Sequence, residues 1–323
     1  MQTKENKSLQ EMEIEARLRF IGHYLDIDAL LNRKTDNQAV EQYYRKSDYF
    51  YDKVHNRGGD SIHLGLSDDD FYHKDDFLNQ ARFVAGLLDR PSMQVLELGA
   101  GKLINTKYLA KQFPNHAFTA LDLPDRHFLK NRVPGNVTLK EGDYNDLSAF
   151  PEASFDLVFA VETLCYAESK KHVFGQIARV LKPGGKLVVF DGYNARPEEA
   201  MTESERRAAA VTWTAMCVTP RDQFSGDRIK DLKELSFTDV EMTDLTEKVR
   251  PTLRRLDRIC GYFFMHPRFV KFARKHLPYD AVMNSIAGWL MLYTYTPDDR
   301  RILEYCRIVA TKGTPTGDET ISK

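Results

Sequence analysis

The feature that most restricts the fold of this chain is an alternation of short apolar runs with segments of helical periodicity from residue 93 onward. Strands alternating with helices at this spacing predict a parallel sheet covered by helices on both faces. Beyond residue 195 this alternation becomes less regular. The expected strands are residues 93–99, 116–123, 137–143, 155–164 and 186–193.

The flanking regions extend this pattern. The first 90 residues have helical spacing of apolar positions, and two further strands are expected at residues 237–245 and 301–312. About sixty mainly helical, aromatic-rich residues separate these two strands, which is too long for a structureless loop. We therefore expect an α/β fold: a Rossmann-like, doubly wound seven-stranded sheet, an N-terminal helical segment and a helical cap before the last strand. The expected divisions are 1–90, 91–195 and 196–323.

Composition and charge exclude several classes of function. Lys and Arg total 46 against 47 Asp and Glu, so no general attraction for nucleic acid is expected. No apolar run is long enough for a transmembrane segment, and the first twenty residues resemble no targeting peptide. The four cysteines lie far apart in the sequence, which indicates neither a metal site nor a disulfide framework. We expect a cytoplasmic protein without a bound metal.

Polar and glycine residues follow the first three expected strands. Gly99 and Gly101 allow a tight turn before a helix whose free N–H groups can face a ligand. Asp122 ends the second strand and can accept both hydroxyls of a ribose, and Asp143 follows the third, where an adenine amino group could donate to it. A Gly-x-Gly turn alone also suits a nicotinamide cofactor.

Four motifs resemble those of the class I S-adenosylmethionine-dependent methyltransferases: VLELGAG, ALDL, EGDYND and RVLKPGGKLVV. The resemblance covers residues 93–195 and implies S-adenosyl-L-methionine as the cofactor. It places Glu162 beside the sulfonium. Lys102 departs from the family, which often has a small residue there. The resemblance implies that the cofactor is bound by Tyr44, Glu97, Gly99, Gly101, Asp122, Leu123, Asp143, Tyr144 and Val161.

The flanks carry a looser resemblance to small-molecule methyltransferases of the sterol, tocopherol and sarcosine/dimethylglycine type. It rests on YYRKSDYFYD with IHLGL, on MTDLTEKVRPTL and on NSIAGWLMLYTY. Aromatic residues in these segments form a suitable lining for an apolar acceptor, although such residues are more often plain core. The residues expected to bind the acceptor are Tyr51, Arg255, Trp289 and Tyr293.

Three residues are candidates for moving a proton during the reaction. Glu162 is the favoured general base, and His63 and Tyr166 are the others. His63 has a structural alternative, a side chain hydrogen-bonded to backbone. A basic run on a predicted helix either holds an anionic group such as a diphosphate or is a solvated helix face; its residues are Arg250, Arg254, Arg255 and Arg258.

Together these features predict methyl transfer from S-adenosylmethionine to a small, mainly apolar acceptor, an isoprenoid, prenyl diphosphate, sterol or prenylated ring, favoured at carbon. One alternative is N-methylation of a small polar amine, as in the sarcosine/dimethylglycine branch. Another is a cofactor-binding regulatory or scaffold subunit without turnover. The expected partner is the small-molecule acceptor, with no nucleic acid, and homo-oligomer formation is left open.

Overall fold

The computed structural model describes residues 9–50, 63–124, 128–277, 279–296 and 300–314. Within them, one seven-stranded sheet has the order β3-β2-β1-β4-β5-β7-β6. β7 runs in the direction opposite to the other six strands. The strands are β1 (Gln94–Leu98), β2 (Ala117–Asp122), β3 (Val137–Glu141), β4 (Phe155–Val161), β5 (Leu181–Asn194), β6 (Phe237–Asp244) and β7 (Leu303–Lys312). The predicted sheet is therefore confirmed.

Helices cover both faces of the sheet, as the continuous apolar strands require. β4 is buried along its whole length, and its alternate side chains enter two separate core clusters. Leu157 and Phe159 pack in the cluster shared with α4 (Asn79–Ala85) and α5 (Ile104–Gln112). Val158 and Ala160 pack in the cluster shared with α6 (Lys170–Val180) and α8 (Ser225–Glu234).

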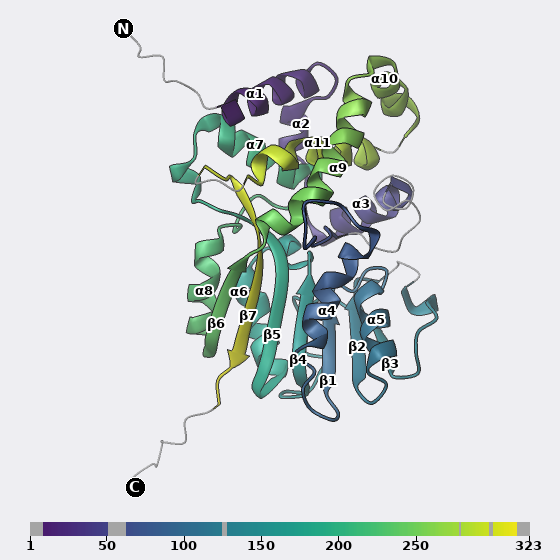
Figure 1. Cartoon of the computed structure of the whole chain (residues 1–323), viewed down its shortest axis with the longest axis vertical. Coiled ribbons are helices and arrows are strands. Elements are labelled where there is room, and N and C mark those ends of the chain that lie inside the picture. Colours follow the sequence, from purple (N-terminus) through teal and green to yellow (C-terminus); the bar gives the residue numbers. More distant parts are fainter. Residues whose placement is uncertain (1–8, 51–62, 125–127, 278, 297–299, 315–323) are drawn as a thin grey trace.

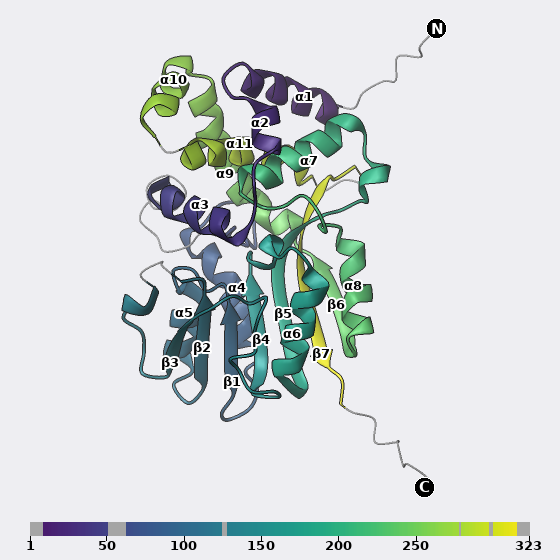
Figure 2. The same cartoon turned by 180° about the vertical axis from the view of Figure 1, so that it is seen from behind.

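A layer of helices lies beyond the carboxyl ends of the parallel strands (Figures 1 and 2). Three of these helices are inserted between β6 and β7, which confirms the predicted cap: α9 (Thr246–Phe264), α10 (Pro267–His276) and α11 (Tyr279–Thr294). The others are α1 (Leu9–Gly22), α2 (Ile27–Leu31), α3 (Asn37–Phe50) and α7 (Glu203–Ala215). Short 3-10 turns complete the chain: η2 (Lys74–Leu78), η3 (Phe128–Lys130), η4 (Leu164–Tyr166) and η5 (Glu198–Ala200).

The central helix of this layer is α11, which packs against α9, α7, α1 and α3. α3 is tied to it by polar contacts, because the Tyr43 hydroxyl donates to Asn284 and Arg33, just before α3, pairs with Asp280. The cap and the N-terminal segment thus form one layer above the edge of the sheet where parallel α/β folds bind ligands.

Candidate active site

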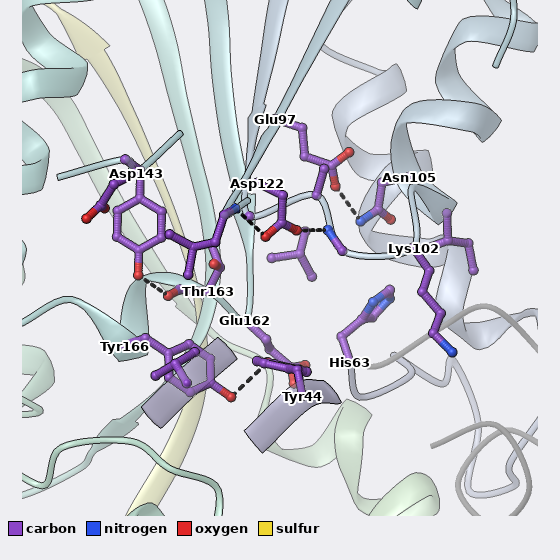
Figure 3. A pocket seen from close by; sticks show the side chains of 18 of the residues that line it. Tyr44, His63, Glu97, Lys102, Asn105, Asp122, Asp143, Glu162, Thr163 and Tyr166 are labelled. Carbon is purple, nitrogen blue, oxygen red and sulfur yellow. Dashed lines mark hydrogen bonds between the residues drawn. The ribbon is translucent and has the colours of Figure 1, made fainter. Parts of the chain in front are cut away.

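A cavity opens at the carboxyl ends of β1, β2 and β4, under α3 (Figure 3). It brings together all nine residues that the sequence predicted at the cofactor, and also the three candidates for moving a proton, His63, Glu162 and Tyr166. Its lining consists of Asn37, Val40, Tyr44, His63, Glu97, Gly99, Ala100, Gly101, Lys102, Ile104, Asn105, Asp122, Leu123, Asp143, Tyr144, Val161, Glu162, Thr163 and Tyr166.

The turn after β1 has a backbone that requires glycine. Gly99 and Gly101 have φ angles of 61° and 53°. A Cβ on Gly99 would lie 1.9 Å from Oγ1 of Thr163, so the space beside this turn is already filled on the β4 side. Glycine is therefore needed both for its left-handed conformation and for the close approach to Thr163.

Asp122 fixes this turn from the end of β2. Its Oδ2 accepts from the backbone N–H of Gly101 at 2.5 Å, and its Oδ1 accepts from the N–H of Leu123 at 2.7 Å. Each carboxylate oxygen has a second lone pair. The buried carboxylate can therefore hold the glycine turn and still accept hydrogen bonds from ligand hydroxyls in the cavity.

Glu97, at the same edge, binds the first turn of α5. Its carboxylate accepts from Nδ2 of Asn105 at 3.0 Å and from the backbone N–H of Thr106 at 3.1 Å, and also from the Thr106 hydroxyl. Burial raises the pKa of Glu97 to about 7. Oδ1 of Asn105 is buried without a hydrogen-bond partner among the described residues. Since Asn105 lines the cavity, this oxygen is a candidate acceptor for a ligand N–H.

Asp143 lies at the opposite end of the cavity and connects it to α3. Its Oδ2 accepts from Nδ2 of Asn37 at 2.6 Å, and its Oδ1 accepts from the backbone and side chain of Asn145. The neighbouring Tyr144 ring is buried, and its hydroxyl donates to the backbone carbonyl of Thr163 at 2.9 Å. Asn37 was not predicted, because nothing in its local sequence distinguishes it from other polar residues near a helix start.

Glu162 follows β4 in a left-handed conformation, with a φ of 48°. Its Oε1 accepts from the backbone N–H of Leu64 at 2.7 Å and from the Tyr305 hydroxyl at 2.9 Å. Burial raises its pKa to about 8, and the nearby Asp191 adds to this shift. The free protein therefore keeps this carboxyl largely protonated at neutral pH.

A second cavity lies on the other side of Glu162, between the sheet edge and the cap. It encloses about 770 Å³ of empty space, part of it open to solvent. Tyr44, Glu162 and Tyr166 line both cavities, and the Tyr44 hydroxyl donates to that of Tyr166 at 2.8 Å. The rest of its lining is Leu64, Cys165, Asp191, Gly192, Trp213, Met216, Val218, Leu256, Cys260, Asn284, Ala287, Gly288, Met291, Tyr295 and Tyr305.

The His63 side chain is hydrogen-bonded to backbone, which is the structural alternative to a proton-moving role, although the residue also lines the first cavity. Its Nε2 lies 2.8 Å from the carbonyl oxygen of Phe77, to which a protonated Nε2 donates. Burial lowers the pKa of His63 to about 4, so the ring is neutral at physiological pH. A neutral ring held by a backbone carbonyl orients neighbouring groups more readily than it accepts a proton.

Of the predicted acceptor-binding residues, Trp289, Tyr293 and Arg255 are absent from the described lining of both cavities. Trp289 stacks on Phe264 with ring centroids 4.8 Å apart, and the Arg17 guanidinium lies over both Trp289 and Tyr293. These two aromatics occupy the face of α11 that contacts α1 and α9. The cavity is lined instead by the opposite face of α11, through Asn284, Ala287, Gly288, Met291 and the following Tyr295.

The other two residues predicted to bind the acceptor are Arg255 and Tyr51. Arg255 lies over the Tyr72 ring at 4.9 Å and lines neither cavity. The basic run that includes it is divided among several contacts, since Arg250 donates to the Tyr295 carbonyl and Arg254 to the Asp70 carbonyl. Tyr51 lies outside the described residues.

Residues 96–189 match the model of a methyltransferase domain family. The chain is 28% identical over 216 residues to the sterol 24-C-methyltransferase of Eremothecium gossypii, covering 62% of this chain and 56% of that protein. It is 28% identical over 175 residues to the sarcosine/dimethylglycine N-methyltransferase of Halorhodospira halochloris, covering 50% of this chain and 61% of that protein. The chain thus spans little more than half the length of these relatives.

The chain contains a class I S-adenosylmethionine-dependent methyltransferase domain. Its fold agrees with that of the cyclopropane synthase MmaA2 from Mycobacterium tuberculosis, with a TM-score of 0.66 at 13% identity over 87% of this chain and all of that one. The cofactor of the methyltransferase domain is S-adenosylmethionine. Three features of the first cavity suit this cofactor. They are the glycine turn, the Asp122 carboxylate, which can accept from ribose hydroxyls, and Oδ1 of Asn105, which has no partner among the described residues and can accept from an amino group.

No described helix is both long and apolar enough to cross a bilayer. No three His, Cys, Asp or Glu side chains among the described residues are grouped so that they could hold a metal ion.

The raised pKa of Glu162 predicts a pH-dependent stability. The unfolded carboxyl ionises near its ordinary pKa of 4.5, whereas the folded one stays protonated up to about pH 8. Its contribution is therefore complete below pH 4.5 and is lost as the pH rises toward 8, at roughly 1 kcal/mol per pH unit. We expect Glu162→Gln to lose less stability than the wild type between pH 5 and pH 8 in urea unfolding.

The comparison between the two proteins isolates Glu162 from other titrating groups. The lowered pKa of His63 acts in the opposite direction, because the unfolded imidazole gains a proton below about pH 6.5 while the folded one stays neutral. That contribution is common to wild type and variant. Parallel stability curves for the two proteins would contradict the assignment of a raised pKa to Glu162.

Proposed function

We propose that this protein transfers a methyl group from S-adenosylmethionine to a small, mainly apolar acceptor bound in the second cavity. The observation that carries the proposal is the position of Glu162, which lines both cavities at their junction. A methyl group passing from one cavity to the other would cross beside this carboxyl. The bound cofactor supplies an activated methyl on its sulfonium, so the protein has to align the acceptor and manage one proton.

The lining of the second cavity supports an apolar acceptor. Seven of the 18 lining residues are leucine, methionine, valine, tryptophan or alanine, and two are buried cysteines. Four tyrosines, two carboxyls and Asn284 supply the polar positions. This combination of apolar walls and few polar groups is typical of small-molecule sites. The relative from Eremothecium gossypii is named as a carbon methyltransferase of sterols, which also favours this class of acceptor.

Glu162 is the group that we propose removes the proton after transfer. Methylation of an alkene carbon leaves a cationic centre, and a carboxylate nearby can both stabilise it and accept its proton. The aromatic faces of Tyr44, Tyr166 and Trp213 line the same space and can stabilise a cation. Tyr305 donates to Glu162 and would hold the carboxylate in place.

The acceptor class is tested by incubating the protein with labelled S-adenosylmethionine and a panel of sterols, prenyl diphosphates, quinols and small amines. We expect label to be transferred to members of the apolar groups. Transfer only to amines would overturn the apolar acceptor and favour the alternative suggested by the sarcosine-type relative. Cofactor binding without transfer to any of them would favour a regulatory role.

Filling the second cavity should impair acceptor binding selectively. Ala287 is buried in the cavity wall on α11, so Ala287→Leu adds volume where the acceptor would lie. We expect the KM for the acceptor to rise about tenfold or more, while affinity for S-adenosylhomocysteine stays the same. Trp289→Phe, on the opposite face of α11, is the matched control and should leave the KM nearly unchanged. Equal effects of the two variants would contradict this location for the acceptor.

A further inference from the structure

Exposed apolar side chains are concentrated at the outer end of the cap. Nine large apolar residues are strongly exposed among the described residues, and six of them lie between residues 262 and 279. We call these six the apolar tip: Tyr262, Met265, Phe269, Phe272, Leu277 and Tyr279. They come from the end of α9, from α10 and from the start of α11, and in both views α10 lies at the edge of the helical layer farthest from the sheet (Figures 1 and 2).

The same segment carries only positive charge. Residues 258–279 contain no Asp or Glu, in a chain whose overall net charge is −1. All of their Arg and Lys side chains belong to exposed residues: Arg258, Arg268, Lys271, Arg274 and Lys275. α10 buries Val270 and Ala273 against the protein, which leaves Phe269 and Phe272 exposed between these cations.

We propose that the apolar tip and its surrounding cations dock this protein on the surface of an anionic lipid membrane. A short basic helix with exposed aromatic side chains is the arrangement that binds in the interfacial plane, with the rings among the acyl chains and the cations beside anionic headgroups. The protruding position of α10 suits a deformable lipid surface. Because the charged Arg and Lys side chains of residues 258–279 are all positive, an anionic lipid surface is favoured over a neutral one.

Two helices, α9 and α11, contribute residues both to the apolar tip and to the wall of the second cavity. Leu256 and Cys260 line that cavity from α9, and Tyr262 is exposed six residues after Leu256, about 9 Å along the helix axis. α11 begins at the tip with Tyr279 and contributes Asn284 and Ala287 to the cavity wall. A membrane bound here would lie next to the helices that enclose the proposed acceptor site, although docking itself does not depend on the proposed reaction.

Sedimentation with lipid vesicles tests the docking without any substrate. We expect the full chain to bind vesicles of phosphatidylcholine mixed with phosphatidylglycerol, and to bind phosphatidylcholine alone at least tenfold more weakly. Phe269→Ser with Phe272→Ser should weaken binding to the mixed vesicles about tenfold or more. Lys271→Gln with Arg274→Gln should weaken it roughly 30-fold, since each cation near such a surface contributes about fivefold.

Controls distinguish docking from general effects of the substitutions. Leu129→Ser removes an apolar side chain of similar exposure on η3, and Lys230→Gln removes an exposed cation of α8; both should bind like the wild type. Circular dichroism should show all variants folded, because the altered side chains are exposed. No binding to the mixed vesicles, equal binding to neutral ones, or a dimer that dissociates in Phe272→Ser would each overturn the proposal.

Discussion

Asp122→Ala is expected to weaken binding of S-adenosylhomocysteine on the order of a hundredfold or more, measured by calorimetry. Two effects add in this variant. The carboxylate no longer accepts hydrogen bonds from the cofactor's ribose hydroxyls, and hydrogen bonds to a charged group contribute about 1.5–3 kcal/mol each. The backbone N–H groups of Gly101 and Leu123 also lose their acceptor, so the turn that contacts the cofactor is less well fixed.

A neighbouring carboxylate provides the matched control. Asp146 also follows β3 closely, but it is exposed and accepts from the backbone N–H of Ser148 outside the cavity. Asp146→Ala should bind S-adenosylhomocysteine like the wild type. If Asp122→Ala and Asp146→Ala had the same affinity for S-adenosylhomocysteine, Asp122 would not bind the ribose. The cofactor would then lie in the cavity in another orientation, or outside it.

The sheet and the cofactor cavity were predictable because local sequence determines them. Gly99 follows β1 directly and Asp122 is the last residue of β2, and the carboxyl ends of neighbouring parallel strands meet at one edge. The position of the cap was also predictable, since sixty helical residues between two strands must pack somewhere. In each case the deciding information lies in one continuous stretch of the sequence.

The lining of the second cavity was not predictable in the same way. Trp289 and Tyr293 lie on α11, as expected, but which face of a helix meets a cavity depends on the helices packed around it. α11 is surrounded by α1, α3, α7 and α9, so no simple apolar stripe distinguishes its faces. Two small residues, Ala287 and Gly288, line the second cavity, whereas the aromatic residues that the sequence favoured lie on the other face of α11. The contact of Asn37 with Asp143 likewise joins residues 106 positions apart.

Glu162→Gln is expected to reduce methyl transfer by about 10²–10⁴-fold while leaving affinity for S-adenosylhomocysteine within a few-fold of the wild type. Glutamine keeps an oxygen that can accept from Leu64 and Tyr305, so the local structure is preserved while the proton acceptor is lost. A single-turnover assay with labelled cofactor measures the transfer step directly. Equal loss of binding and transfer would indicate that Glu162 acts on the cofactor rather than on the acceptor.

The pH profile gives Glu162 a second, independent signature. A base with a pKa of about 8 is ionised only at higher pH, so kcat/KM of the wild type should rise with pH up to about 8 and then level off. Tyr305→Phe removes a hydrogen bond that favours the carboxylate, and should move this rise to higher pH.

Asp191→Asn is the competing test, because burial also raises the pKa of this cavity-lining carboxyl, to about 6. If Asp191→Asn abolished transfer and Glu162→Gln did not, the proton would pass to Asp191, whose oxygens already accept from the N–H groups of Cys165 and Gly192.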